Sequence, residues 1–256
     1  MGFFKKLFEK KICSVCGGEI GLLGNRKLED GNLCKDCARK LSPFFSDRRN
    51  STVSEIKEQL AYREANLEAV KAFNVTASYG DGMKVLLDED ARKFVVTRER
   101  NLEEANPDVL DFAQVTGVDL DITEDENEEM REDKDGNSVS YVPPRYTFSY
   151  DFEMIIRVNH PYFDEIRFQL NSSSVELNPN NPVPMIRKPK PELNRDYREY
   201  EQMGEEIKKA LTEAKQQLRQ EAAAAAAPKT AVQCPNCGAT TIPDDHGCCE
   251  YCGGPV

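Results

Sequence analysis

The sequence predicts an α+β protein built from several modules, in which two small four-cysteine modules flank one antiparallel β domain. Three observations lead to this prediction. Eight of the nine cysteines form paired Cys-x2-Cys motifs, two pairs near each end of the chain. Residues 74–177 contain long stretches that alternate apolar and polar side chains, as half-buried strands do. Other stretches carry apolar residues at helical spacing, so amphipathic helices are expected to adjoin the β domain.

Residues 1–12 are expected to form a short basic amphipathic helix. One face carries apolar side chains and the other carries lysines: Phe3, Phe4, Leu7 and Phe8 against Lys5, Lys6, Lys10 and Lys11. Such a helix favours an anionic membrane surface, where the apolar side chains enter the interface and the lysines meet head groups. The alternative is that the apolar face packs on the adjoining cysteine module or on a partner, since a helix this short is marginal alone.

Residues 13–50 hold the first cysteine set, Cys13, Cys16, Cys34 and Cys37. The two-residue gap lets both sulfurs of a pair reach one tetrahedral metal ion at ~2.3 Å. Because no signal peptide is recognisable, we expect a reducing compartment, where paired motifs hold metal more often than disulfides. The residues between the pairs predict a hairpin with a turn at residues 29–32, and the second pair is expected to open a helical run. This is the order of elements in a treble-clef finger.

Residues 228–256 hold the second set, Cys234, Cys237, Cys249 and Cys252, with the spacing of a zinc ribbon. We predict one structural Zn²⁺ in each set, two per chain, because four thiolates leave no position open for water or substrate. The ninth cysteine, Cys248, is interpreted as a bystander in the turn. The alternative is a competing ligand or an oxidation target. His246 is expected to be a solvated loop residue.

Residues 51–73 predict an amphipathic helix that starts with a capping box, Thr52-x-x-Glu55. Its apolar residues at helical spacing are Val53, Ile56, Leu60, Leu67 and Val70. The antiparallel β domain follows over residues 74–177 as a sandwich or partly closed barrel. Strands are expected at 84–87, 94–97, 115–123, 146–158 and 166–170.

Two features of the β domain resemble sites but are interpreted otherwise. In the acidic stretch 119–135, an EF-hand loop would place Arg131 and Val142 where carboxylates are required. We therefore expect a charged hairpin with its turn at Asp135-Gly136. His160 precedes Pro161 and is expected to be a turn residue rather than a general base.

The remaining residues form a connector and a helix. Residues 178–192 are rich in proline and predict an extended, semi-rigid connector. Residues 193–227 predict a long helix with apolar residues at alternating spacings of three and four, interrupted at Gly204: Leu193, Tyr197, Tyr200, Ile207, Leu211, Ala214 and Leu218. This stripe fits a coiled-coil seam and a helix laid on the β domain equally well.

Charge and motifs restrict the classes of function. The net charge is −11, but residues 1–50 carry +5 and residues 51–190 carry −12, so only the N-terminal part favours a polyanion. No ordering of nucleophile, base and acid and no phosphate-binding glycine loop is recognisable, which argues against an enzyme. We expect a cytoplasmic protein without a membrane-spanning segment.

Three segments resemble known families. CSVCGGEIGLLG, with the later CKDCARKLSPFF, resembles an uncharacterised bacterial family in which a treble-clef-like zinc domain precedes a β domain. EEANPDVLDFAQVTGVDLDI, followed by two long strands and a helix, is similar to bacterial pleckstrin-homology-like domains. CPNCGATTIPDDHGCCEYCGGPV looks like a common zinc-ribbon tail. These resemblances imply interaction and scaffolding rather than chemistry.

The leading hypothesis is therefore a non-enzymatic adaptor that contacts protein partners, with attachment at the inner membrane surface as part of that hypothesis. One alternative is nucleic-acid binding through the basic residues of the first module: Arg26, Lys27, Lys35, Arg39, Lys40, Arg48 and Arg49. Another is a redox-sensing zinc switch that uses Cys248. The sequence does not define an oligomeric state.

Overall fold

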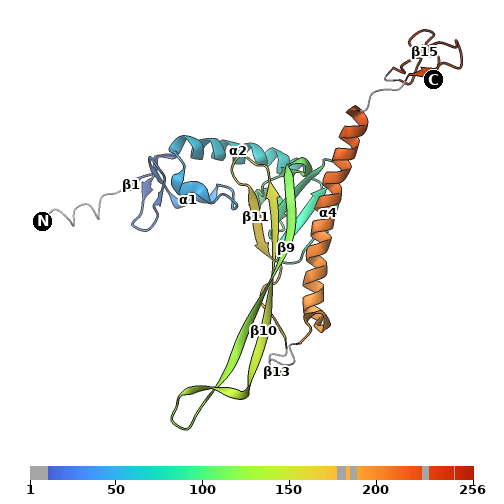
Figure 1. The fold of residues 1–256 in the computed structure, drawn as a ribbon. Coiled ribbons are helices and arrows are strands. Elements are labelled where there is room, and N and C mark those ends of the chain that lie inside the picture. Colours follow the sequence, from blue (N-terminus) through green and yellow to red (C-terminus); the bar gives the residue numbers. More distant parts are fainter. Residues whose placement is uncertain (1–10, 178–182, 185–188, 227–230, 245) are drawn as a thin grey trace. The chain divides into compact units, whose positions relative to one another are not determined.

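The computed structural model describes residues 11–177, 183–184, 189–226, 231–244 and 246–256 (Figure 1). These residues form two compact units, which divide between Lys215 and Gln216. Most of the expected N-terminal helix lies outside the described residues. Its last two positions, Lys11 and Ile12, form strand β1 and pair with β2 (Glu19–Ile20), so a helix that continues to residue 12 is wrong.

The first cysteine module consists of two small hairpins and a short helix. β1 pairs with β2, and β3 (Arg26–Lys27) pairs with β4 (Asn32–Leu33) before α1 (Lys35–Arg39) and the 3-10 helix η2 (Asp47–Asn50). The turn expected at residues 29–32 is present, where Leu28 N donates to Gly31 O. The core of this module is closed by buried apolar side chains, which are Ile20, Leu28, Leu33, Leu41 and Ile56.

Helix α2 (Val53–Ala72) follows, and it begins with the capping box that the sequence predicts between Thr52 and Glu55. Asp30 Oδ1 also accepts a hydrogen bond from Val53 N at 2.7 Å, which joins the β3–β4 turn to the helix start. The buried face differs from the expected one. Leu60 and Leu67 are only half-buried, and the buried stripe is Ile56, Gln59, Arg63, Asn66 and Val70. An apolar pattern could not reveal this face because three of its five members are polar.

The buried polar side chains of α2 connect the cysteine module to the segment before β8 (Leu110–Asp111). The Arg63 guanidinium donates to Asp108 at 2.7 Å, and Asp108 also accepts from the Ser42 hydroxyl at 2.7 Å. Arg63 donates as well to the carbonyls of Lys40 and Asn106. Both charged side chains are almost fully buried, so this network holds the two parts of the first unit together.

Two antiparallel sheets follow α2. The first has four strands in sequence order, β5 (Ala77–Tyr79), β6 (Lys84–Asp88), β7 (Lys93–Thr97) and β8, with the short helix α3 (Leu102–Ala105) between β7 and β8. A short 3-10 helix, η3 (Phe112–Gln114), leads to β9 (Val115–Glu132) in the second sheet. There β9 pairs along one edge of β10 (Ser138–Val158). The other edge of β10 holds β11 (Glu165–Gln169), β12 (Val175–Leu177) and β13 (Val183–Pro184).

The core of the second sheet shows the period of two that the sequence predicts. Alternate residues of β10 from Phe148 to Val158 are buried, as are Ile166 and Phe168 of β11. Beyond this core, β9 and β10 continue as a hairpin past the other strands (Figure 1). The pairing shifts between Ser140 and Arg145, and the turn lies at residues 133–137, where Gly136 has φ 82°. The charged hairpin expected for the acidic stretch is therefore present.

Helix α4 (Arg195–Ala226) follows the 3-10 helix η5 (Pro191–Leu193), and its first half packs on the second sheet. The Tyr197 ring contacts the ring of Phe152 edge-on at 5.1 Å, and Ile207 and Leu211 are fully buried. A Cβ at Gly204 would lie 2.6 Å from a methyl group of Leu120, so glycine permits this close approach. The structure thus favours a helix on the sheet over a coiled-coil seam for this half, and Leu193 is exposed outside it.

The second unit contains the end of α4 and the second cysteine module. In that module β14 (Val232–Gln233) pairs with β15 (Thr240–Thr241). Across the part of the chain that the structure describes, no helix combines the length and the apolar character that crossing a bilayer requires.

We predict that Asp108→Asn lowers the free energy of unfolding by about 3 kcal/mol, because the Arg63 charge would remain buried without a counter-ion. Chemical denaturation of the metal-loaded protein measures the change. Glu68→Gln is the matched control, since Glu68 pairs with Lys71 on the exposed face of the same helix, where such pairs contribute less than about 1 kcal/mol. Equal effects of the two substitutions would contradict the role of the buried pair.

We predict that Ile207→Ala destabilises the first unit by about 2–5 kcal/mol, because it leaves a cavity under α4. This loss of stability should be the same at every protein concentration. If α4 formed an intermolecular coiled coil, the loss would change with concentration. Thermal unfolding at several concentrations tests this. Leu193→Ala, at a position 78% exposed, should change stability by less than about 0.5 kcal/mol.

Candidate metal centres

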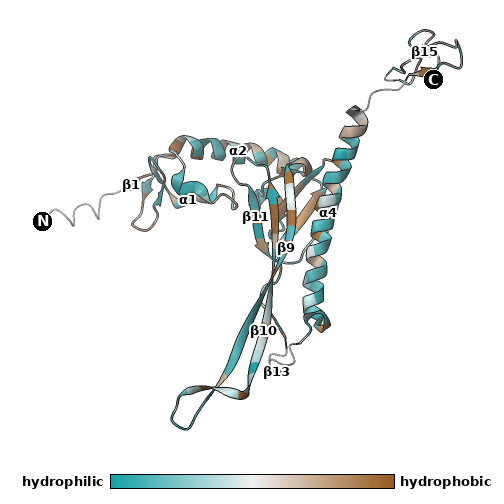
Figure 2. Ribbon diagram, in the orientation of Figure 1, coloured by the Kyte–Doolittle hydropathy of each residue, from teal (hydrophilic) through white to brown (hydrophobic). Residues whose placement is uncertain are grey.

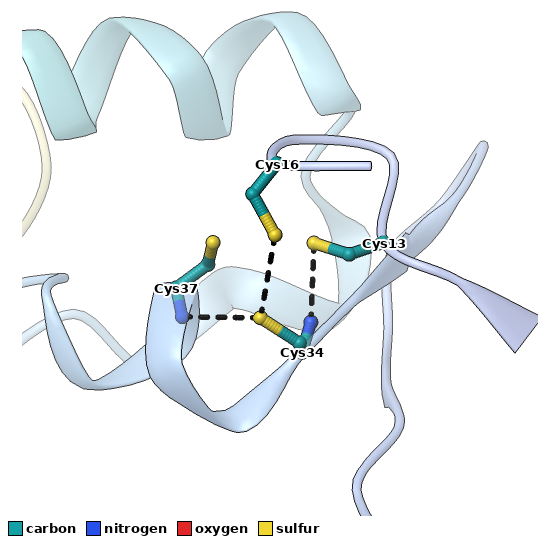
Figure 3. Close-up of side chains that lie close together, drawn as sticks. All are labelled: Cys13, Cys16, Cys34 and Cys37. Atoms are coloured by element: carbon teal, nitrogen blue, oxygen red, sulfur yellow. Dashed lines mark hydrogen bonds between the residues drawn. The ribbon is translucent and has the colours of Figure 1, made fainter. Parts of the chain in front are cut away.

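The first candidate centre brings together all four cysteines of the N-terminal set (Figure 3). The four sulfurs lie within 4.8 Å of one another, and the Sγ atoms of Cys16 and Cys34 are 3.8 Å apart. Four thiolates around one ion at ~2.3 Å would place their sulfurs about 3.8 Å apart. The sulfur positions therefore already suit a tetrahedral ion.

Two different local structures present these sulfurs. Cys13 and Cys16 lie in the turn between β1 and β2, whereas Cys34 caps the start of α1 and Cys37 lies in its first turn. The Cys34 sulfur accepts the backbone N–H of Cys37 at 3.3 Å, and the Cys13 sulfur accepts that of Cys34 at 3.4 Å. N–H groups that point at thiolates stabilise their negative charge, as the surroundings of metal ligands generally do.

The second candidate centre groups the C-terminal cysteines, again within 4.8 Å. The Sγ atoms of Cys234 and Cys252 are 3.6 Å apart, and those of Cys237 and Cys249 are 3.7 Å apart. Both pairs here lie in turns. This centre therefore differs from the first, in which a helix supplies one pair.

Three of the four cysteine pairs share one turn geometry. In each, the N–H of the first cysteine donates to the carbonyl five residues later, and the N–H four residues later donates back to that cysteine. The residue that returns the bond is always a glycine with positive φ: Gly17 at 73°, Gly238 at 71° and Gly253 at 68°. A side chain at these positions would strain the turn. The repeated pattern explains why a glycine follows each of these pairs.

Hydrogen bonding lowers the pKa of one thiol in the first centre. Burial raises the pKa of Cys13, but N–H groups of Cys16, Cys34 and Val15 outweigh it, and the pKa falls to about 6. Burial and the neighbouring thiol of Cys34 raise the pKa of Cys37. A cation therefore meets a thiolate at neutral pH, and its own charge then favours ionisation of the remaining thiols.

In the second centre the pKa is lowered at two thiols, those of Cys234 and Cys249, and a backbone hydrogen bond from the Cys237 N–H is the main cause at Cys234. Burial raises the pKa of Cys249, but hydrogen bonds from the N–H groups of Cys252 and Tyr251 outweigh burial and lower this pKa to about 6. At Cys252 the Gly254 N–H lowers the pKa, but the surrounding thiols of Cys234 and Cys237 prevail and raise it to about 12.

Cys248 and His246 lie outside the group of four sulfurs. The Cys248 sulfur is 3.8 Å from the His246 carbonyl, and the Asp244 carboxylate accepts the N–H groups of both residues at 2.8 and 2.9 Å. Asp244 therefore orders this loop through hydrogen bonds to the backbone. Each centre could thus hold one ion with four thiolates, a coordination that leaves no position for a reacting molecule.

His160 lies in the turn after β10 and contacts α2, which the sequence did not indicate. Its Nε2 is 3.0 Å from the Tyr62 hydroxyl, and its ring stacks on Phe163 at 4.1 Å. Burial lowers the pKa of His160, and burial raises the pKa of Tyr62 to about 12. Because His160 Nδ1 accepts the Tyr162 N–H at 3.3 Å, the neutral imidazole carries its proton on Nε2 and donates it to the Tyr62 hydroxyl. This bond suits packing of α2 against the turn after β10.

Residues 11–59 match the family model of a domain of unknown function, DUF4428. The matched range contains the first four-cysteine centre and the start of α2 with Ile56, the helix residue that closes the module core. No curated protein and no solved structure matches the chain. The family match and the two sulfur groups together fit a metal-binding module at the N-terminal end.

Proposed function

We propose that this protein is a non-enzymatic, zinc-binding adaptor of the bacterial cytoplasm that contacts protein partners and attaches to the inner membrane surface. The observation that carries the adaptor role is the hairpin of β9 and β10 beyond the core. Residues 124–146 of these strands are mostly exposed and contribute little to packing. An exposed, ordered element without a stabilising role suits contact with a partner.

The chemical character of the hairpin supports the same proposal. Its surface is mainly hydrophilic (Figure 2), with a strongly acidic β9, while Val142 is 94% and Met130 47% exposed. The outer edge of β9 pairs with no strand of the described residues. A partner with a basic segment would meet complementary charge there.

Zinc is the proposed ion in both centres. Four thiolates in tetrahedral arrangement favour zinc over hard cations such as Mg²⁺ and Ca²⁺, which take oxygen ligands. A closed thiolate site supplies folding energy to a small module rather than catalysis. We further propose a treble-clef arrangement for the first module and a zinc ribbon for the second.

The middle of the chain is proposed to be a pleckstrin-homology-like domain. Support comes from the order of elements, in which a four-stranded antiparallel sheet precedes a second antiparallel sheet and a helix packs on that sheet. Domains of many functions share one fold, so this proposal concerns architecture only.

A second candidate function, nucleic-acid binding, is favoured by one observation. Arg26, Arg48 and Arg49 lie near one another on the first module. Burial lowers the pKa of Arg48, and the nearby positive charges of Arg26 and Arg49 lower it further. The net charge of −12 over residues 51–190 opposes this function, since it repels phosphates.

We predict that the purified protein contains two zinc ions per chain by elemental analysis. Cys13→Ser and Cys234→Ser should each remove one ion, because three thiolates hold the metal less tightly than four. The double variant should contain none. Cys248→Ser is the matched control and should retain both ions. Two tightly bound ions in the double variant would disprove the assignment.

We predict that replacing residues 128–142 by a short Asn-Gly turn removes a protein partner without unfolding the protein. Chemical cross-linking in lysate of the source organism, followed by mass spectrometry, compares wild type with this variant. The free energy of unfolding should change by less than about 1 kcal/mol, because the exposed hairpin buries little apolar area. Asp81→Asn, a surface change in another loop, is the control. An unchanged partner set would contradict the proposed role of the hairpin.

A further inference from the structure

The turn between β2 and β3 exposes two adjacent leucines. Leu22 is 81% exposed and Leu23 is 83% exposed, although the preceding Ile20 is buried in the module core. The turn is ordered by the Gly24 N–H, which donates to the Gly21 carbonyl at 2.9 Å. Single exposed leucines are common, but an adjacent pair in the connection between two hairpins forms an apolar projection that water solvates poorly.

Basic residues lie beside this projection. The Arg26 guanidinium lies 3.5 Å from the Leu23 carbonyl, to which it donates. The Arg48 guanidinium donates to the Lys27 carbonyl at 2.7 Å, which places η2 beside β3. Arg49 follows Arg48 in η2. Burial lowers the pKa of Arg48, and the neighbouring positive charges of Arg26 and Arg49 lower it further. Three arginines and Lys27 thus form a cationic cluster behind the two leucines, and we call these six residues the Leu–Arg tip.

We infer that the Leu–Arg tip docks the protein on an anionic lipid bilayer, where Leu22 and Leu23 enter the interface and the basic side chains contact head groups. This inference rests on the proposed attachment at the inner membrane surface and names the residues that provide it. An apolar end followed by cations matches the order in which a bilayer presents its acyl region and its phosphates.

The side-chain chemistry favours a bilayer over nucleic acid. Single-stranded nucleic acid is bound by aromatic side chains that stack on bases, and the Leu–Arg tip has none. Two exposed leucines would contribute nothing to phosphate contacts, but they gain free energy in an apolar interface. The uneven charge of the chain, +5 over residues 1–50 and −12 over residues 51–190, would also turn this module toward an anionic surface.

The test is co-sedimentation of the full-length, metal-loaded protein with vesicles of phosphatidylcholine, with or without phosphatidylglycerol. We expect binding only when phosphatidylglycerol is present, and weaker binding as salt increases. Leu22→Ser/Leu23→Ser should reduce the partition coefficient at least tenfold, as expected for two large apolar side chains. Leu193→Ser, at another exposed leucine, is the matched control and should bind like wild type.

The cationic part is tested separately by Arg26→Gln/Arg49→Gln, which should weaken binding roughly fivefold per charge. Arg198→Gln, an exposed arginine of α4, is its control. Both multiple variants must keep the metal content and melting temperature of wild type. If the leucine variant does not, the arginine variant alone decides the matter.

Three results would overturn the inference. The first is that wild type does not bind anionic vesicles. The second is that the tip variants bind as wild type does while Phe4→Glu/Phe8→Glu abolishes binding, which assigns attachment to the N-terminal segment instead. The third is that wild type binds DNA or RNA, but not vesicles, at the same salt concentration. In each case the proposed contact with a protein partner is tested independently, by the cross-linking experiment on the β9–β10 hairpin.

Discussion

The buried ion pair between Arg63 and Asp108 is the interaction on which the first unit depends. Helix α2 has Ile56 in the core of the cysteine module and Arg63 in the junction with the segment before β8. A charge buried this deeply is tolerated only when other groups satisfy it, and Ser42 and backbone carbonyls do so here. Hydrogen bonds are directional, so this junction fixes one orientation of the cysteine module relative to the segment before β8, whereas an apolar contact would allow several.

The metal centres depend on the same principle at a smaller scale. The first module has a modest apolar core, whereas the buried residues among those described in the second are two of its cysteines and Thr241. In both modules, four thiolates gathered in one place would repel one another without a cation. Backbone N–H groups point at the sulfurs, and glycines with positive φ close three of the four pairs. The fold of each module and its capacity for metal therefore arise from the same hydrogen bonds.

The surfaces proposed for function are projections rather than cavities. The hairpin of β9 and β10 and the Leu–Arg tip are both exposed, and each combines charge with a few apolar side chains. Their charges are opposite in sign. An acidic hairpin and a basic tip in one unit can engage a basic partner and an anionic surface without competition, which is the requirement for an adaptor.

Local chemistry in the sequence was sufficient for the cysteine pairs, the capping box at Thr52, the turn at Gly136 and the alternating core of β10. These features depend on residues close in the chain, so spacing and turn preferences reveal them. Helix α2 shows where this reasoning ends. The apolar pattern selected Leu60 and Leu67, which are half-buried, and missed the polar side chains that are buried.

Only the tertiary structure decided the features that join distant residues. Arg63 and Asp108 are 45 positions apart, and neither has a local signal that marks it for burial. The same holds for the contact between Tyr62 and His160 and for the cluster of Arg26 with Arg48. The stripe of α4 suited a coiled coil and a sheet equally, because both bury one helical face. The sheet surface around Phe152 and the space for Gly204 beside Leu120 decided between them, and that surface exists only once β9 and β10 have paired.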